Sequence, residues 1–336
     1  MPLFKTIEEI RTYLPGVNVS FEFADILPLI NIVEKEFIIP ILSELEYEDL
    51  VADYTPEVHT MSPSQEELLI PCQKAIAYLS YLKWIPMGNL QVGSGGFTVP
   101  NNDKMAPASQ WRVEDFKEQM AFEGYNGLQD ILIYLWSAAA GTFVLWEASE
   151  ERTNYRNTII LSAKEFQNHC DIKNSFELFL KLRNWQEFVE VHHIKSICGE
   201  ELLAEIKEEI LNDDVSANNQ VLLDRFIYKA VAHLSAAEAC GELVVEFSTL
   251  GLIERSTGDR DNIKVFKPGS DSRNSLYMQN RLRTGQVYLE DLRLFLKNNP
   301  DTYPLYTASD AFEDPDDDTE GDDDLINSED GKIFVM

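Results

Sequence analysis

Hydrophobic positions recur at three- and four-residue steps along most of the chain, which predicts a mainly α-helical protein. Within residues 23–45, the apolar side chains Leu27, Ile30, Val33 and Phe37 fall on one helical stripe. Such a stripe is typical of a helix that packs one face against a core. We therefore expect a bundle of amphipathic helices.

Further elements are predicted in the first half of the chain. Pro40 is expected to kink or end that first long helix, because proline has no backbone N–H to donate. The next helix is expected to begin near Ser64, which opens a capping box of the form Ser-x-x-Glu. Residues 90–99 have apolar ends around a glycine turn, which predicts a short β-hairpin. A last helix is expected over 111–136, with a break at Asn126-Gly127.

This series of patterns occurs twice, as a tandem repeat. Lys74-Ala-Ile-Ala-Tyr-Leu-Ser80 matches Lys229-Ala-Val-Ala-His-Leu-Ser235, with five of seven residues identical. Collinear matches, 155 to 161 residues apart, extend from the capping boxes at Thr6 and Ser162 into the last predicted helices. A collinear series of this kind predicts duplication of one helical module.

The second copy is expected to contain the same elements as the first. Its helices are predicted over 175–189, from an N-cap at Asn219, and over 275–296, and its β-hairpin over 243–253. The sequence thus predicts a mainly α fold, a tandem duplication of a helical-bundle module with a short β-hairpin, plus an acidic C-terminal tail. The expected boundaries are 1–140 for the first module, 141–158 for a linker, 159–300 for the second module and 301–336 for an extended tail.

Net charge adds a constraint on partners. The 336 residues carry a formal charge of −30, with 58 acidic and 28 basic residues. Phosphate backbones and anionic lipids repel such a surface, so general nucleic-acid binding and membrane attachment are disfavoured. Residues 310–330 contain twelve Asp or Glu and no Lys or Arg. Much of the charge therefore lies in the tail, although the body remains acidic.

Cysteine usage and the N-terminus indicate a reducing compartment. The four cysteines form no Cys-x-x-Cys pair, and the N-terminus has no basic and apolar signal pattern. The longest uncharged apolar stretch, Ile131 to Trp146, is short for a membrane span, so we interpret it as a buried helix.

Candidate chemistry is sparse. The cluster Gly93-Ser94-Gly95-Gly96 lacks the Gly-Lys-Ser/Thr end of a phosphate loop, and a hairpin turn is favoured. The pairs His169-Cys170 and His192-His193, with Cys198, show no metal-ligand spacing, so core or half-buried side chains are favoured over a metal site. We therefore predict no bound metal and no cofactor.

Neither catalysis nor calcium binding is indicated. No Gly-x-Ser-x-Gly is present, and no acid, base or nucleophile stands out from the background, so we expect no enzyme. Residues 316–324 look faintly like a calcium loop, but the twelfth position is Asn327 where a bidentate Glu is needed. A charged, extended tether is favoured for this stretch. It ends in Lys332-Ile-Phe-Val-Met336, which is either a docking tip or an idle terminus.

The order of the elements resembles a known class of protein. An Ala-Ile-Ala-Tyr helix, a Gly-Gly-Phe hairpin, a polar loop with Ser109-Gln-Trp111 and a Leu-rich last helix resemble an uncharacterised family of phages and prophages of Bacteroidota. More loosely, they resemble phage head–tail connector (adaptor) proteins, small helical subunits with a protruding hairpin that form a ring under the portal. The resemblance is clearest over 20–136 and weaker over 160–297, where it rests mostly on the repeat. Connector subunits usually have one such unit, whereas this chain has two.

The resemblance implies a structural virion protein, an oligomeric ring subunit that links portal to tail and lines the DNA conduit. It implies contacts with copies of itself and with portal and tail proteins, with DNA passing without specific binding, and assembly in the bacterial host cytoplasm. The alternative is a cytosolic interaction protein, either an assembly chaperone or an inhibitor whose acidic tail mimics nucleic acid. The partner-binding residues that we expect are Gly93, Ser94, Gly95, Gly96, Phe97, Phe247, Leu250, Gly251, Leu252, Ile333, Phe334, Val335 and Met336.

Overall fold

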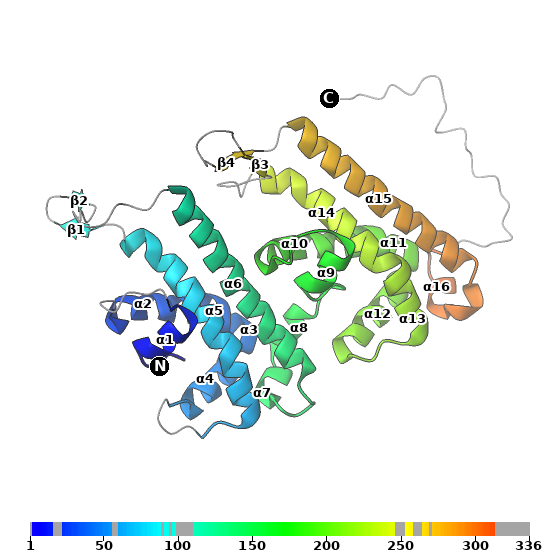
Figure 1. Cartoon of the computed structure of the whole chain (residues 1–336). Helices are drawn as coiled ribbons and strands as arrows, with labels where there is room; N and C mark the ends of the chain where they lie inside the picture. Colours follow the sequence, from blue (N-terminus) through cyan, green and yellow to red (C-terminus); the bar gives the residue numbers. More distant parts are fainter. Residues whose placement is uncertain are drawn as a thin grey trace.

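The structure, a computed structural model, shows a helical protein with two similar halves (Figure 1). The described residues are 2–15, 22–55, 60–88, 91–93, 96–98, 110–245, 253–257, 264–268 and 271–312.

The first half, here called module one, is built around two long antiparallel helices, α5 and α6, that pack along each other. Shorter helices cover one side of this pair (Figure 1). Its elements are α1 Ile7–Tyr13, α2 Phe23–Val33, the π-helix η1 Glu34–Ile38, α3 Ile39–Leu42, α4 Glu44–Asp53, α5 Pro63–Gly88, β1 Gln91–Gly93, β2 Gly96–Thr98, α6 Gln110–Ser137, α7 Val144–Glu147 and α8 Glu150–Tyr155.

The second half, module two, repeats this order around the long pair α14 and α15. Its elements are α9 Ala163–His169, α10 Phe176–Val189, the π-helix η2 Glu190–Ile194, α11 Lys195–Cys198, α12 Glu200–Asn212, α13 Ala217–Leu222, the π-helix η3 Leu223–Ile227, α14 Tyr228–Val245, β3 Ile253–Thr257, β4 Lys264–Pro268, α15 Asp271–Lys297, the 3₁₀-helix η4 Pro300–Thr302 and α16 Pro304–Thr307. The mainly helical class predicted from the sequence is confirmed.

Both modules begin with the same capped helix. Thr6 Oγ1 accepts a hydrogen bond from the Glu9 N–H, and Ser162 Oγ accepts one from the Glu165 N–H. At Thr6 the reciprocal bond from the cap N–H to the Glu9 carboxylate is also made. These bonds satisfy amides that a helix start leaves unpaired, so the capping box predicted at Thr6 is confirmed. At Ser162 the serine cap is confirmed, but the Glu165 carboxylate accepts from the Leu161 N–H.

Pro40 does not end the second helix, one of the two outcomes predicted for it. The chain stays helical from Phe23 through Pro40 to Leu42, because the π-helix η1 intervenes. In η1 the Ile39 N–H donates to the Glu34 carbonyl, five residues back, which shifts the hydrogen-bond register just before the proline. The helix ends instead at Ser43, whose positive φ of 71° turns the chain into α4.

The turn that ends this helix is repeated in module two. Gly199, with φ of 81°, stands 156 residues after Ser43 and leads into α12. A Cβ on Gly199 would lie 2.5 Å from Ser309 Cβ, so this position requires glycine for both its dihedral and its space.

Two predicted helix starts are displaced. The cap of α5 is Ser62, which exchanges hydrogen bonds with Gln65, rather than Ser64, whose carbonyl instead accepts from the Tyr134 hydroxyl. In module two the N-cap is Ser216. Asn219, three residues later, is buried, and its amide donates to Glu205 and Glu209. In both cases an earlier serine satisfies the free amides first.

The break predicted at Asn126-Gly127 is absent, since α6 runs unbroken through it. The glycines on α6 serve close packing against α5. A Cβ on Gly124 would lie 2.7 Å from Leu79 side-chain atoms, and one on Gly127 would lie 3.0 Å from the Ala75 backbone nitrogen. Gly285 on α15 meets Leu234 in the same way, at 2.5 Å.

Each pair of long helices is connected through a short antiparallel strand pair, β1 with β2 and β3 with β4. In the first, Val92 lies opposite Phe97. The position predicted for the second strand segment, 243–253, is wrong in part. Residues 243–245 are still helical, because α14 extends to Val245, and β3 begins only at Ile253.

The predicted linker, 141–158, contains two helices that pack on module one. On α7, Trp146 donates its N–H to Glu46 and its indole N–H to the Ile41 carbonyl, while α8 contacts α3. The residues after α15 repeat this arrangement, with Tyr303 and Tyr306 buried as Phe143 and Trp146 are. The first part of the predicted tail is therefore packed against module two.

The match continues one turn further. Ser149 Oγ donates to the Trp146 carbonyl at 2.7 Å, and Ser309 Oγ donates to the Tyr306 carbonyl at 2.7 Å. Two later residues also correspond, since Arg152 lies over the Trp146 ring and Phe312 packs edge-on against the Tyr306 ring. The chain thus leaves both modules by the same route.

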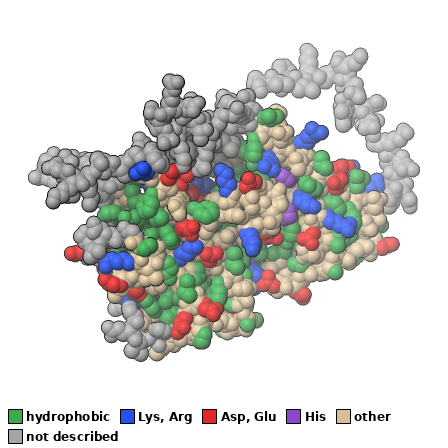
Figure 2. Space-filling view, in the orientation of Figure 1, with side chains coloured by type: hydrophobic (Ala, Val, Ile, Leu, Met, Phe, Trp, Pro, Cys, Tyr) green, Lys and Arg blue, Asp and Glu red, His purple; other side chains and the backbone are tan. Residues whose placement is uncertain are grey.

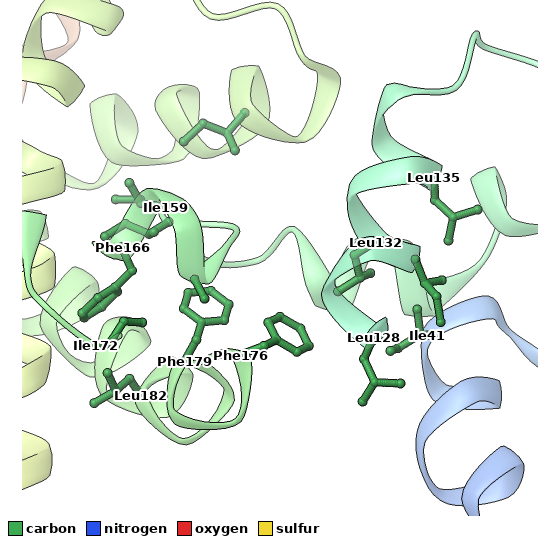
Figure 3. Close-up of a cluster of buried hydrophobic side chains, with 14 of the residues drawn as sticks. Ile41, Leu128, Leu132, Leu135, Ile159, Phe166, Ile172, Phe176, Phe179 and Leu182 are labelled. Carbon is green, nitrogen blue, oxygen red and sulfur yellow. The ribbon is translucent and has the colours of Figure 1, made fainter. Parts of the chain in front are cut away.

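One hydrophobic core joins the two modules, and α6 contacts α10 across the junction. Figure 3 shows the α6 side chains Leu128, Leu132 and Leu135 on one side and Phe176 and Phe179 of α10 on the other. None of the helices described here is long and apolar enough to cross a membrane.

Candidate functional site

The predicted hairpin site falls only in part on described residues. Gly93 lies at the end of β1, and Gly96 and Phe97 lie in β2. Ser94 and Gly95 lie outside the described residues. So do the remaining predicted contact residues, namely Phe247, Leu250, Gly251, Leu252, Ile333, Phe334, Val335 and Met336.

The histidines and cysteines that the sequence places near one another do not converge. His192 and His193 lie on η2 beside the exposed ring of Phe188, whereas His169 stacks on Tyr228 between α9 and α14. All four cysteines are buried and unbonded to one another. Within the described residues, no group of three His, Cys, Asp or Glu side chains is arranged to hold a metal ion.

A repeated feature that the sequence did not reveal is a buried carboxylate in each of η1 and η2. Glu34 accepts hydrogen bonds from the Leu3 N–H and the Tyr47 hydroxyl, at 2.6 and 2.9 Å. Glu190, 156 residues later, accepts from the Ile159 N–H and the Lys207 ammonium, at 2.7 and 2.9 Å. Each carboxylate ties the segment before a module's first helix to its second helix.

Burial is the main influence on both carboxylates. It raises the pKa of Glu34 and the pKa of Glu190, and the hydrogen bonds named above oppose that rise. Because both oxygens of each carboxylate hold backbone or side chains of the same module, these groups position the fold.

One group of polar side chains converges in module two, between α9, α14 and α15. We call His169, Lys229, His233 and Arg281 the cationic cluster. The Arg281 guanidinium donates to His233 Nδ1 at 3.2 Å, and it lies 4.9 Å from the centre of the Tyr277 ring. Figure 2 shows His side chains with Lys and Arg side chains around them on this half of the surface.

A third ring, Tyr288, completes the cluster. His233 stacks on Tyr288, and the Lys229 ammonium lies 5.4 Å from the centre of the same ring. Burial, followed by the nearby Arg281 charge, lowers the pKa of His233 to about 4. Burial and the charge of Lys229 lower the pKa of His169 in the same sense. At neutral pH the positive charge of the cluster therefore resides on Lys229 and Arg281.

Module one has different residues at the corresponding positions. His233, Arg281 and Tyr288 match Tyr78, Met120 and Gly127. Lys229 matches Lys74, whose ammonium pairs with Glu123 at 3.2 Å and Asp130 at 3.5 Å. One of those two carboxylates is replaced in module two, where Thr284 stands in the place of Glu123. The cluster is therefore a feature of module two that module one does not share.

The junction between modules is a further candidate surface, and it joins unlike faces. On α6 the Gln129 side chain accepts from the Ala163 N–H of module two at 2.8 Å. Arg156, buried at the end of α8, donates to both Asp213 carboxylate oxygens and to the Leu211 carbonyl. The matching face of α15 carries the ion pair of Arg293 with Glu290 instead.

These features define a tandem helical-repeat protein, in which two copies of one module meet through different faces. Comparison with known families agrees, because two segments of the chain, residues 38–156 and 194–316, each match the same family. The chain belongs to that family, a family of unknown function (DUF6712). The predicted tandem duplication is thereby confirmed, with the two segments starting 156 residues apart. No curated protein and no solved structure matches the chain.

Proposed function

We propose that the chain is a structural virion protein, a connector or adaptor ring subunit that links a phage portal to the tail and lines the DNA conduit. The observation that supports this most is the junction of the two modules. α6 of the first contacts α10 of the second, and the matching pair of faces is not used twice. Ring subunits also meet head to tail, through two different faces of the same unit.

The surface chemistry is compatible with that role. The body of the chain carries about −19 once the tail charge is set apart. A conduit wall of this sign does not hold passing phosphates, because attraction would slow the DNA. The short strand pairs between the long helices, β1 with β2 and β3 with β4, are proposed to project and to contact neighbouring subunits.

The intact protein provides the test. Native mass spectrometry of the purified full chain is expected to give a closed ring of identical subunits. Mass spectrometry of purified particles is expected to find the chain at a fixed ratio to the portal protein. A stable monomer or compact dimer that is absent from particles would overturn the proposal.

The second candidate is a cytosolic interaction protein, either an assembly chaperone or an acidic mimic of nucleic acid. The observation that favours it is the run of twelve acidic residues in 310–330. Neutralising that run in the full chain distinguishes the two proposals. Lost binding to a basic partner protein supports the mimic, whereas lost ring stacking with unchanged partner binding supports the connector.

A further inference from the structure

The contact between the two modules is directional. Module two contributes the start of α9 and the helix α10, here called a donor face, and module one contributes the outer side of α6, here called an acceptor face. The Ala163 N–H donates to the Gln129 side chain across this contact at 2.8 Å, and both residues are buried. Burial, followed by the charge of Glu177 on α10, raises the pKa of Tyr125 on α6 to about 12. The donor face of one module thus fits the acceptor face of another.

Each chain has a second pair of these faces at its two ends. Figure 1 shows α1 and α2 on one side of the molecule, α6 beside α9 and α10 in the middle, and α15 on the other side. The outer donor face, α1 with α2, corresponds to α9 with α10, and the outer acceptor face, α15, corresponds to α6. Because the modules are copies, the contact that joins them can recur between two chains.

The outer acceptor face is exposed where the inner one is covered. Glu290 on α15 corresponds to Gln129, and it is exposed whereas Gln129 is buried. Val287 and Leu294, which are 53% and 44% exposed, lie about one helical turn before and after it. An acceptor oxygen between two exposed apolar side chains therefore lies on α15 at the position where α6 accepts the Ala163 N–H.

The outer donor face is exposed and partly apolar as well. Asp25, Pro28 and Ile32 are exposed on one stripe of α2, three and four residues apart. At the start of α1, Ile7 corresponds to Ala163. The Ile7 N–H is therefore the donor that we expect to meet the acceptor on α15.

Charge distinguishes the outer donor face from the inner one. Glu8 on α1 takes the place of Lys164 on α9. Asp25 on α2 takes the place of Lys181 on α10. All four side chains are exposed, so the exchange changes what these surfaces attract and leaves the core unchanged. At these two positions the outer donor face is acidic and the inner one is basic.

The outer acceptor face differs from the inner one by two cations. Arg283 on α15 takes the place of Phe122 on α6. Arg293 takes the place of Leu132. The two guanidinium groups can therefore bind carboxylates of an α1–α2 face, whereas they would repel the lysines of an α9–α10 face.

The other charges on the outer faces are compatible with this contact. Glu8 pairs with Arg11, and Arg293 pairs with Glu290, each within its own helix at the surface. Exposed pairs of this kind contribute little, so they can rearrange when a partner binds. Asp291 has an aspartate as its counterpart on α6, so it is common to both acceptor faces.

We propose that the outer side of α15 is the docking site for α1 and α2 of a second copy of this chain, in repetition of the contact between the modules. The inference rests on the proposed ring, because it names the two faces through which the subunits join. Two different faces that meet in this way give a head-to-tail assembly. It closes into a ring or continues as a filament according to the rotation between copies.

Cysteine substitutions in the full chain test this pairing. A chain with Ile7→Cys and a chain with Glu290→Cys, mixed and treated with oxidised glutathione, are expected to form a disulfide-linked dimer. Neither chain alone is expected to do so. Efficient dimer formation by the Glu290→Cys chain alone would show that α15 pairs with itself, which would overturn the proposal.

Two controls calibrate the yield of linked dimer. One chain with both Gln129→Cys and Ala163→Cys is the matched positive control, because it links the inner contact on which the proposal is based. Val144→Cys, mixed with the Glu290→Cys chain, is the negative control, since Val144 is 61% exposed on α7 and belongs to neither face. The four native cysteines are buried, so background links from them are expected to be few.

Charge exchange tests the specificity of the contact. Glu8→Lys with Asp25→Lys gives the outer donor face the lysines of module two, and it is expected to weaken association about tenfold, because like charges then meet at α15. Glu48→Lys with Glu208→Lys makes the same change in net charge at exposed positions outside both faces and is the matched control. Analytical ultracentrifugation measures association, and circular dichroism checks the helices. Equal weakening by both pairs, or weakening by neither, would contradict the proposal.

The results separate this inference from the ring proposal. A closed ring without links between positions 7 and 290 would overturn the inference and leave the ring proposal standing. Linked chains that form open filaments and are absent from particles would support the inference and overturn the ring proposal. A chain that stays monomeric would overturn both.

Discussion

The two long helices of module one approach each other closely at Gly127. At the corresponding position of module two, a tyrosine ring packs beside the cationic cluster. Gly127 meets the backbone of Ala75, and Tyr288, at the corresponding position of α15, stacks on His233. The caps, the π-helices and the turns at Ser43 and Gly199 are alike in both. The two copies therefore share the caps, π-helices and turns that set the helix ends, whereas the side chains between their long helices differ.

The largest effect is expected from exchanging residues at that level. Gly127→Tyr should destabilise the protein by about 3 kcal/mol or more, because even a Cβ would lie 3.0 Å from the Ala75 backbone nitrogen. The reverse change, Tyr288→Gly, should cost about 1 to 2 kcal/mol through lost stacking and a weaker helix. Urea denaturation followed by circular dichroism measures both, and equal costs would contradict the comparison.

The second-largest difference in stability between the modules is expected at the buried carboxylates Glu34 and Glu190. Lys207→Met leaves Glu190 buried without its cation and should cost about 3 kcal/mol. Tyr47→Phe removes an uncharged donor from the Glu34 carboxylate and should cost about 1.5 kcal/mol. The same denaturation experiment compares them, and a larger loss for Tyr47→Phe would show that the two sites are not organised as described.

The pH dependence of stability depends on the same groups. Because the pKa of Glu34 is raised on folding, the native state holds its proton more tightly than the unfolded chain does. Its contribution is full below the usual carboxyl pKa of 4.5 and is lost as pH rises through the raised value. Glu34→Gln should flatten this fall in stability, which denaturation curves between pH 4 and 8 would record.

The contribution of His233, one of the two histidines of the cationic cluster, has the opposite sign. Its pKa falls on folding from 6.5 to about 4, so the unfolded chain binds the proton more tightly. Its contribution is present above pH 6.5 and is lost as pH falls toward 4. His233→Tyr introduces the residue of module one. It should reduce the loss of unfolding free energy between pH 6.5 and 4 by about 1 kcal/mol, allowing for solvent screening. An unchanged slope would show that His233 is not the titrating group.

The smallest difference concerns the matched lysines. Lys74→Met should cost about 0.5 kcal/mol, because two partly exposed ion pairs are lost. Lys229→Met should change stability by about zero, since no carboxylate partner is lost from the described residues. Thermal denaturation at low salt detects the contrast, and the loss for Lys74→Met should shrink at 0.5 M salt.

The sequence predicted the features that depend on local spacing. The three- and four-residue spacing of apolar residues predicted the long helices, and the matched peptides at Lys74 and Lys229 predicted the duplication. The start of the first helix was also correct, because a Thr-x-x-Glu box satisfies its amides within four residues. Ser64 failed for the same local reason, since Ser62 two residues earlier makes an equivalent box with Gln65.

Features that depend on partners far along the chain were missed. Nothing in the spacing of Glu34 or Glu190 shows that a backbone amide 31 residues away bonds to each. Gly127 was interpreted as a helix break because glycine weakens helices, whereas packing against Ala75 is the reason that glycine is required there. The cationic cluster was overlooked because its members come from three helices, although the change from Tyr78 to His233 inside the matched peptide was a visible signal.

The shared exit route at Ser149 and Ser309 bears on how such chains are built. In module one the route runs through α8 directly into the next module, and in module two the residues that match Ser149 and Arg152 are Ser309 and Phe312. Phe312 is therefore a suitable position for fusing a further unit. A unit joined there would follow the same backbone path out of module two that module two follows out of module one. A third unit would also need an acceptor face on α15, where the ion pair of Arg293 with Glu290 now stands in the place of the Gln129 contact.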